Sequence, residues 1–429
     1  MKNILVISPD LIGKLMAGPG IRYWNIAKEL SKCFKVVLLI PNDINDTKEL
    51  LNNEEIEIDM ISKRKIDMYL KSADVVITQG IIINKFSQLR KKKVPLVVDL
   101  YDPFILENLE LRKNNGNLNK QFRYSIDLSI LIEQIKYGDF FLCASEKQKD
   151  YWMGFFSAMR KINPTSYDFL IKSEDFISVV PFGIEKASIE SDGKNIRKKY
   201  SIKDSDTLLV WAGGIWEWMD PITLIKAIDM IKDKGVKCLF MGTKRPNQFI
   251  DYTPKVKEVI NLSNELNLTN KNIFFEDWVP FKEREEYLMA SDIGVTTYFK
   301  NLEGEYSFRT RILDYIWSNK PFIITKGDYF ADIAEKNKIG LTVEEKDPND
   351  LADKILYLKD NKELYNNCKY QLNILKESFY WENGIKPLVK FCRNPYKING
   401  KTLISDKVNI YSFIKRQIEK IKSIIMRFR

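Results

Sequence analysis

The stretch LLVWAGGIWEWMDP, residues 208–221, contains an apolar strand, a paired-glycine turn and the start of a helix. Leu208–Ala212 is an uninterrupted apolar run, which is typical of a strand buried on both faces. Gly213 and Gly214 allow a tight turn whose backbone can approach a ligand closely, and Pro221 suits the first position of a helix. Together these features predict an open parallel α/β sheet with a loop that faces a ligand.

The same alternation of short apolar runs and helix-period segments extends in both directions along the chain. It includes Ile4–Ile7 and Val36–Ile40 near the start and Ile293–Thr297 and Pro321–Thr325 later on. A break rich in Lys, Ser and Asp between residues 185 and 205 divides the two series. We therefore expect an α/β fold with two Rossmann-like parallel-sheet domains facing a cleft. The expected divisions are an N-terminal domain at 1–184, a linker at 185–205, a second domain at 206–360, helices at 361–400 that return to the first domain, and a tail at 401–429.

Composition excludes several kinds of chemistry. The 429 residues include no histidine, so His-based zinc sites and Ser-His-Asp nucleophiles are excluded. The 68 Lys and Arg exceed the 58 Asp and Glu by ten, which favours anionic partners such as nucleotide phosphates or acidic lipids. The D-x-D sequence Asp204-Ser205-Asp206 lies in the polar break, where we expect it to be solvated, and so we expect no metal site.

Cysteine usage and the N-terminal segment favour a cytoplasmic protein. The five cysteines are dispersed and include no CxxC pair, which is typical of reduced thiols. The apolar run Ile4–Ile7 is too short for the core of a signal peptide.

Two loops of the first series carry candidate acceptor-side residues. Gly18, Gly20 and Arg22 lie in the first strand-to-helix loop, either as a structural turn or as a surface facing substrate. Tyr101 and Asp102 follow the strand Leu96–Leu100, at the edge where open α/β sheets bind ligands. For Asp102, capping of the following turn is the alternative.

The stretch NLEGEYSFRTRILDY, residues 301–315, contains acids and arginines at an expected loop-to-helix junction. Arginines and the free amides at a helix start would form a pyrophosphate site. The spacing of Arg311 and Asp314 also permits an ion pair within one helix. Trp216, in the paired-glycine turn, either lines a pocket or fills a seam between domains.

On these residues the chain resembles GT-B glycosyltransferases, most of all retaining glycosyltransferase family 4. Gly213-Gly214 resembles the glycine-rich turn of that family, and Trp278-Val279-Pro280 resembles its strand ending in Val-Pro. Residues 308–321 resemble its signature of two spaced acids, with Asp314 in the place of the second acid. Asp99–Pro103 and Phe308–Arg311 also resemble a bacterial subgroup associated with surface-polysaccharide synthesis.

The chain departs from the family pattern at three places. The Arg and Lys of the family's glycine turn correspond here to Gly214 and Met219, the first acid of the signature corresponds to Tyr306, and the first-domain His corresponds to Tyr101. Other cations must therefore meet the diphosphate. The resemblance implies catalytic roles for Asp102, Glu305 and Arg309; donor contacts from Gly213, Gly214, Trp216, Lys244, Arg245, Val279, Phe308, Arg309, Thr310, Arg311 and Asp314; and acceptor-side contacts from Gly18, Gly20, Arg22, Tyr101 and Asp102.

The resemblance implies a metal-independent transferase that moves a sugar from a nucleotide-diphosphate sugar to a glycan or lipid-linked acceptor, with retention. It implies no cofactor and no nucleic-acid partner. A nucleotide-sugar 2-epimerase of the same fold is one alternative, although such enzymes normally use His. A non-catalytic sugar-nucleotide-binding relative is another, motivated by the missing Arg and Lys of the glycine turn.

The tail Lys401–Arg429 has eight Lys or Arg against two acids, a net charge of +6. Apolar residues recur in it every three or four positions, from Tyr411 to Phe428. This pattern predicts a basic amphipathic helix that attaches the protein peripherally to the anionic inner face of a membrane. Packing of the stripe on the protein body or on another subunit is the alternative.

Overall fold

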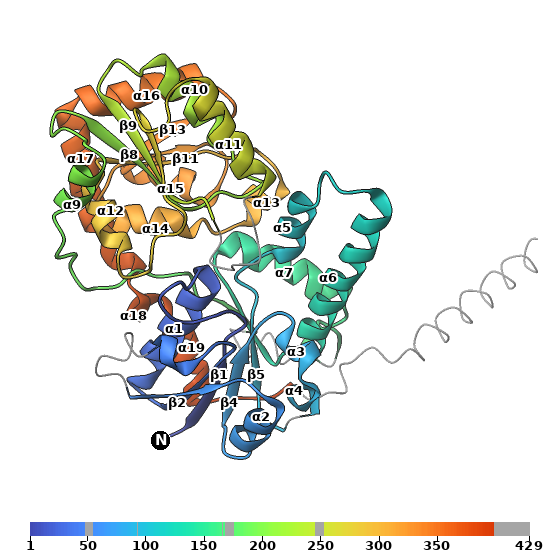
Figure 1. Ribbon diagram of the computed structural model, residues 1–429. Coiled ribbons are helices and arrows are strands. Elements are labelled where there is room, and N and C mark those ends of the chain that lie inside the picture. The colour runs from blue at the N-terminus through green and yellow to red at the C-terminus, as the bar shows by residue number, and fades with distance from the viewer. Residues whose placement is uncertain (48–54, 92, 165, 168–175, 245–252, 399–429) are drawn as a thin grey trace, which may run out of the picture.

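The computed structural model describes residues 1–47, 55–91, 93–164, 166–167, 176–244 and 253–398. It contains two parallel sheets, each covered by helices, which stand one above the other in Figure 1. The predicted α/β fold with two Rossmann-like sheets is confirmed. Within the described residues, no helix is both long enough and apolar enough to cross a membrane.

The first sheet has seven parallel strands in the order β3-β2-β1-β4-β5-β6-β7. Every residue of β4, β5 and β6 is buried, because helices cover both faces. Register follows the apolar pattern, with Ile4 between Val36 and Val75. The strands are β1 (Asn3–Ile7), β2 (Lys35–Ile40), β3 (Ile56–Met60), β4 (Val75–Thr78), β5 (Leu96–Asp99), β6 (Phe140–Cys143) and β7 (Ile177–Val179). The helices are α1 (Gly18–Ser31), α2 (Lys63–Leu70), α3 (Ile82–Lys85), α4 (Ser87–Lys91), α5 (Phe104–Leu111), α6 (Asn117–Tyr137) and α7 (Glu146–Ala158), with a 3-10 turn at Ile44–Thr47.

The second sheet has six parallel strands in the order β10-β9-β8-β11-β12-β13. They are β8 (Thr207–Gly214), β9 (Val236–Gly242), β10 (Ile273–Phe275), β11 (Ile293–Thr296), β12 (Phe322–Thr325) and β13 (Gly340–Val343). Its helices are α9 (Lys194–Lys199), α10 (Pro221–Met230), α11 (Pro254–Glu265), α12 (Arg284–Ala290), α13 (Leu302–Tyr306), α14 (Thr310–Trp317), α15 (Tyr329–Asn337), α16 (Pro348–Asp360) and α17 (Lys362–Leu375). The helix α10 begins at Pro221, as the sequence predicts, and Asp220 caps it by accepting a hydrogen bond from the Thr223 amide.

The chain then crosses back to the first sheet through a 3-10 turn (Lys376–Phe379), α18 (Trp381–Gly384) and α19 (Lys386–Arg393). At the crossing, Ile184 exchanges backbone hydrogen bonds with Phe379 and Trp381. Phe391 of α19 stacks on Phe140 of β6, with ring centroids 4.3 Å apart. By contrast α17, which we expected to return with these helices, packs on α16 and the second sheet. The crossing therefore lies after residue 375.

Candidate functional site

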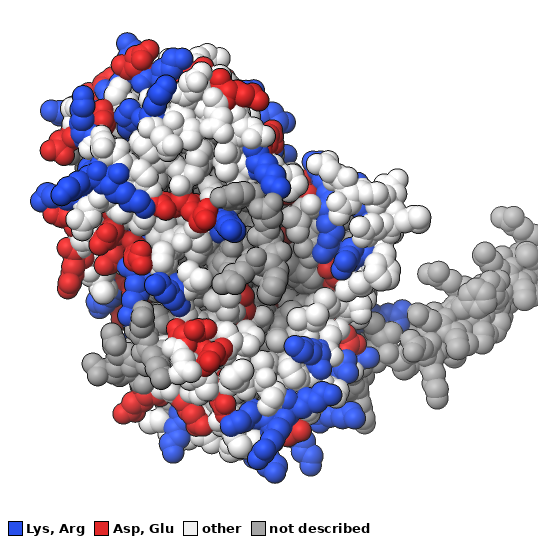
Figure 2. Space-filling view, in the orientation of Figure 1, with Lys and Arg blue, Asp and Glu red and all other residues white. Residues whose placement is uncertain are grey.

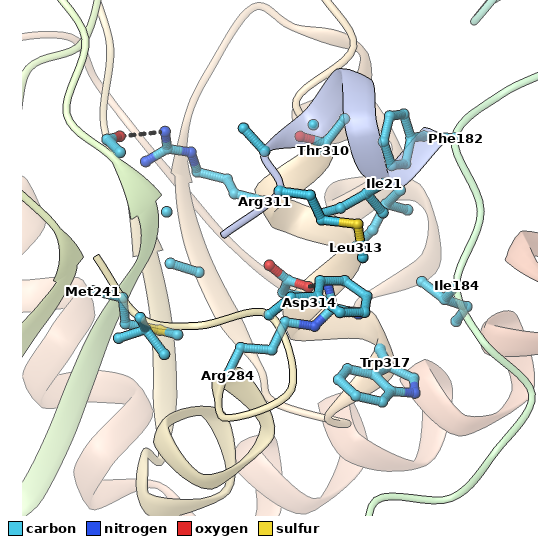
Figure 3. Close-up of a pocket in the computed structure, with 18 of the residues that line it drawn as sticks. Ile21, Phe182, Ile184, Met241, Arg284, Thr310, Arg311, Leu313, Asp314 and Trp317 are labelled. Atoms are coloured by element: carbon cyan, nitrogen blue, oxygen red, sulfur yellow. Dashed lines mark hydrogen bonds and ion pairs between the residues drawn. The ribbon is translucent and has the colours of Figure 1, made fainter. Parts of the chain in front are cut away.

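A cleft lies between the two units, near the carboxyl ends of both sheets. It encloses about 1080 Å³ when the space open to solvent is included. The first unit contributes the loop before α1, and the second contributes its glycine turn and the helix α14 (Figure 3). The residues that line the cleft are Met16, Ala17, Gly18, Ile21, Asn25, Phe182, Gly183, Ile184, Glu185, Ala212, Gly213, Gly214, Trp216, Met241, Trp278, Val279, Phe281, Arg284, Thr310, Arg311, Leu313, Asp314, Trp317 and Trp381.

The paired-glycine turn forms one wall of this cleft. Gly213 has a φ of +79°, which a side chain would strain, and a Cβ added there would meet nothing within 4 Å. A Cβ on the neighbouring Gly242 would lie 2.9 Å from the Gly213 carbonyl carbon, so the strands approach closely here. The backbone of this turn is therefore exposed to a ligand. Of the nearby tryptophans, Trp216 lines the cleft, whereas Trp211 is fully buried in the core.

Arg311, in the first turn of α14, is the most unusual charge of the cleft. Its side chain is buried, with Nη2 donating a hydrogen bond to the Gly214 carbonyl at 2.8 Å and the guanidinium lying 5.0 Å from the Trp211 ring centroid (Figure 3). Its Nη1 is buried without a hydrogen-bond partner, and within the described part of the chain no carboxylate forms an ion pair with it. Burial lowers the pKa of Arg311 to about 10, so the side chain stays charged at neutral pH. A buried cation without a partner anion is suited to bind one.

The N-terminus of α14 adds to this positive field. Arg309 is the N-cap residue and its side chain makes no capping hydrogen bond. Thr310 and Arg311, the first two helical residues, both line the cleft. Because the first amides of a helix lack intrahelical acceptors and carry the positive end of the helix dipole, they favour an anion at this position.

Asp314, one turn further along α14, meets Arg284 of α12 in the lining of the cleft. Their closest oxygen and nitrogen atoms are 3.7 Å apart, and the Arg284 guanidinium lies over the rings of Phe281 and Trp317 (Figure 3). Burial raises the pKa of Asp314, and the charges of Arg284 and Arg311 oppose this shift. Asp314 therefore does not form the intrahelical ion pair with Arg311 that the sequence permitted.

Three residues expected to be catalytic lie outside the lining of this cleft. Arg309 forms a buried double hydrogen bond with Glu303, at 2.8 and 2.6 Å, and so holds the loop before α14. Glu305 is partly exposed, with its carboxylate 3.1 Å from Lys147 Nζ. Burial raises the pKa of Asp102 to about 6, and this carboxyl group shares a hydrogen bond with Glu107. These side chains face the contact between the units and not the cleft.

Of the remaining expected residues, some line the cleft and others lie outside its lining. Gly18 and Val279 line the cleft. Gly20 is a packing glycine, since a Cβ there would lie 2.2 Å from the Leu11 carbonyl oxygen. The list of expected residues outside the lining also includes Arg22, ion-paired with Asp99 at 2.6 Å under the Tyr101 ring; Phe308, packed on Tyr329 and Phe330; and Lys244, whose amide donates to Asp277. Arg245 lies outside the described residues.

Sequence reasoning did not find Arg284, or the crossing residues Phe182, Ile184 and Trp381. Arg284 follows the quoted Trp-Val-Pro segment by four residues, so an extension of that motif into α12 was the available signal. Trp381 reaches the cleft because residues 376–385 return to the first sheet, where Ile184 pairs with Phe379 and Trp381. The return itself was expected, but not that these side chains would line the cleft.

Comparisons with known proteins agree with this architecture. Residues 192–372 match the family model described as "Glycosyl transferases group 1". No curated protein sequence matches the chain. Among solved structures, a glycosyltransferase from Rickettsia africae shares 16% identity and a TM-score of 0.64, over 92% of this chain and 99% of that one. HepE from Anabaena, in complex with UDP and glucose, shares 14% sequence identity and has a TM-score of 0.66, over 92% of this chain and 100% of that one. Sucrose-phosphate synthase from Thermosynechococcus elongatus shares 14% sequence identity and has a TM-score of 0.64, over 92% of this chain and 98% of that one.

The family match covers residues 192–372, which include Arg311 and Asp314, and the structural likeness covers both sheets. The protein is therefore a glycosyltransferase with the GT-B fold.

Proposed function

We propose that the protein transfers a sugar from a nucleoside-diphosphate sugar to a glycan or lipid-linked acceptor. The observation that carries this proposal is Arg311, a buried cation without a partner anion at the head of α14. The diphosphate would lie against the free Nη1 of Arg311, the first amides of α14 and the backbone of Gly213. HepE, which has this fold, is known in complex with UDP-glucose, and that supports the same donor class here.

The geometry supports a division of labour around the donor. Asp314 lies one helical turn from Arg311 and is held near Arg284. A carboxylate one helical turn from the cation that would hold the diphosphate is suited to accept hydrogen bonds from the ribose hydroxyls. The rings and the apolar side chains of Met241, Trp278 and Val279 then offer a surface for the nucleobase.

In this proposal the transfer proceeds with retention and without a metal, as the resemblance to family 4 implies. The bond between the sugar and the diphosphate breaks while the acceptor hydroxyl oxygen forms the new glycosidic bond. The hydroxyl proton passes to the departing diphosphate. Arg311 and the α14 amides would stabilise the negative charge that grows on the diphosphate, so no protein nucleophile is needed.

We further propose a role in bacterial surface-polysaccharide or glycoconjugate synthesis, with peripheral attachment to the inner face of the membrane. The subgroup motifs and the basic tail Lys401–Arg429 support this role. The tail lies outside the described residues, so its support comes from the sequence alone.

A thermal-shift series tests the donor proposal. UDP, GDP, ADP and their sugar conjugates should be compared, because a ligand at 100 times its Kd adds about 2.7 kcal/mol to the free energy of unfolding. We expect at least one nucleoside diphosphate to stabilise the wild type and to lose this effect in Arg311→Met. If none of them stabilises the wild type, the proposed donor site is wrong. Release of free sugar from the stabilising conjugate would then separate an enzyme from a non-catalytic binder.

A further inference from the structure

The α5–α6 hairpin projects from the first unit, with α5 beside α13 of the second unit (Figure 1). The inner half of α6 is anchored in the core, where Leu131 and Ile135 are buried. The outer half, from Asn117 to about Ile126, extends beyond the body of the protein. The hairpin begins at Phe104, directly after the carboxyl end of β5, so its base lies at the sheet edge that faces the second unit.

The outer half of α6 carries an uncovered apolar stripe. Leu118, Phe122 and Ile126 are spaced four residues apart, and their exposed fractions are 90%, 65% and 39%. Leu109 and Leu111, at the end of α5, are also exposed. Residues four apart share one face of a helix, so Leu118, Phe122 and Ile126 form one apolar stripe on α6. Large side chains that gather in this way usually mark an interaction surface.

Positive charge borders this apolar surface. The acids at the tip are already paired, Asp127 with Arg112 and Glu110 with Lys113. Arg123 is exposed, lies beside the stripe three residues before Ile126, and has no acidic partner within the described ranges, whereas Lys120 lies on the other face of α6. In Figure 2 the projecting hairpin is mostly white, with blue Lys and Arg surfaces beside it.

We propose that this hairpin tip docks on the surface of an anionic lipid bilayer. Leucine and phenylalanine on one exposed face, with Arg123 beside them, fit the boundary between lipid headgroups and acyl chains. Each cation near such a surface adds to the attraction. A protein partner would need an acidic group to match Arg123, whereas an anionic bilayer offers negative charge and an apolar layer at once. The docking does not depend on catalysis. Its consequence, that the cleft faces a membrane-embedded acceptor, rests on the proposed transfer to a lipid-linked acceptor.

A matched pair of full-chain variants tests the proposal. The test variant is Leu118→Ser with Phe122→Ser. The control is Tyr370→Ser with Ile374→Ser, because these residues are also four apart on one helix, α17, with exposed fractions of 65% and 57%. In Figure 1, α17 lies on the opposite side of the molecule from the hairpin. The tail is present in both variants, so its contribution to binding is common to them.

The measurement is co-sedimentation with vesicles of phosphatidylglycerol and phosphatidylcholine, at several ratios of the two lipids. We expect the hairpin variant to lose at least about tenfold in apparent affinity for anionic vesicles, and the control to bind as the wild type does. Both variants should keep the wild-type thermal midpoint and nucleoside-diphosphate binding. If the wild type binds no nucleoside diphosphate, the proposed function is contradicted, but this vesicle test is unaffected.

Equal vesicle binding by the two variants would overturn the proposal. So would a wild type that forms dimers in solution when the hairpin variant is monomeric and binds vesicles normally, because a second copy of the chain would then cover the stripe. A polarity-sensitive dye on Leu118→Cys, in a Cys33→Ser background, gives an independent readout. Its emission should shift to the blue on addition of anionic vesicles, and an unchanged spectrum would count against docking.

Discussion

Arg309 and Arg311 are two residues apart, yet the structure predicts opposite consequences when each is replaced by Met. Arg311 carries a charge that burial disfavours, since its pKa falls from an ordinary value of about 12.5 to about 10. At pH 7 this shift corresponds to about 3 kcal/mol against the charged folded form. The Arg311→Met change removes that penalty, but it also loses the hydrogen bond to Gly214 and the contact with Trp211, worth about 1.5 and 1 kcal/mol. The free energy of unfolding should therefore change by less than about 1 kcal/mol.

By contrast, Arg311→Met should clearly weaken nucleotide binding. Loss of a charge-assisted contact of Arg311 to the diphosphate corresponds to about 1.5–3 kcal/mol, or roughly 10- to 150-fold in Kd. Arg309→Met instead leaves Glu303 buried without a cation, and it should destabilise the fold by about 3–5 kcal/mol. Urea unfolding measures the stabilities, and calorimetric titration with the nucleoside diphosphate that gives the largest thermal shift measures the affinities. The reasoning fails if Arg311→Met binds as the wild type does, or if it destabilises the fold as much as Arg309→Met.

Four further predictions follow from the same contacts and from the tail. Asp314→Ala should weaken nucleoside-diphosphate binding about tenfold but leave inorganic pyrophosphate binding unchanged, because Asp314 is assigned to the ribose; equal losses in calorimetry would contradict that role. Burial raises the pKa of Asp328 to about 6, so its ionisation costs stability as pH rises through the interval from about 4 to 6. Asp328→Asn, which can still cap α15, should therefore be more stable than the wild type at pH 7–8 and lose this advantage at pH 4, and a pH series of urea unfolding would reveal a constant difference if this is wrong. Transfer activity should persist in excess EDTA, whereas a strict need for manganese or magnesium would refute the diphosphate chemistry. A chain that ends at Asn399 should bind anionic vesicles more weakly than the full chain, and high salt should weaken both; equal sedimentation would discard the membrane role of the tail.

The cleft shows where sequence patterns suffice for a site and where they do not. Gly213, Gly214 and Asp314 were expected from local motifs, and the structure places them in the lining. A turn glycine and a residue near a helix start are positioned mainly by their own neighbours, so their surroundings can be inferred from short stretches. Arg22 and Asp102 follow equally good local signals, but other contacts withdraw them from the cleft. Arg22 is bound by Asp99, 77 residues away, and the half-buried Asp102 shares a hydrogen bond with Glu107 of α5.

The sequence by itself determined the two parallel sheets and the glycine turn that opens the second of them. Apolar runs with no polar face must be covered on both sides, and this physical requirement acts wherever such runs occur. Only the tertiary structure decided between Arg309 and Arg311. Arg309 pairs with Glu303 and lies near Asp328, whereas Arg311, among the described residues, has a hydrogen bond to the carbonyl of Gly214, 97 residues earlier, and a contact with the Trp211 ring, but no carboxylate partner. Whether a buried arginine has a carboxylate partner depends on distances that the fold alone sets, and that difference is why we propose Arg311, and not Arg309, as the diphosphate ligand.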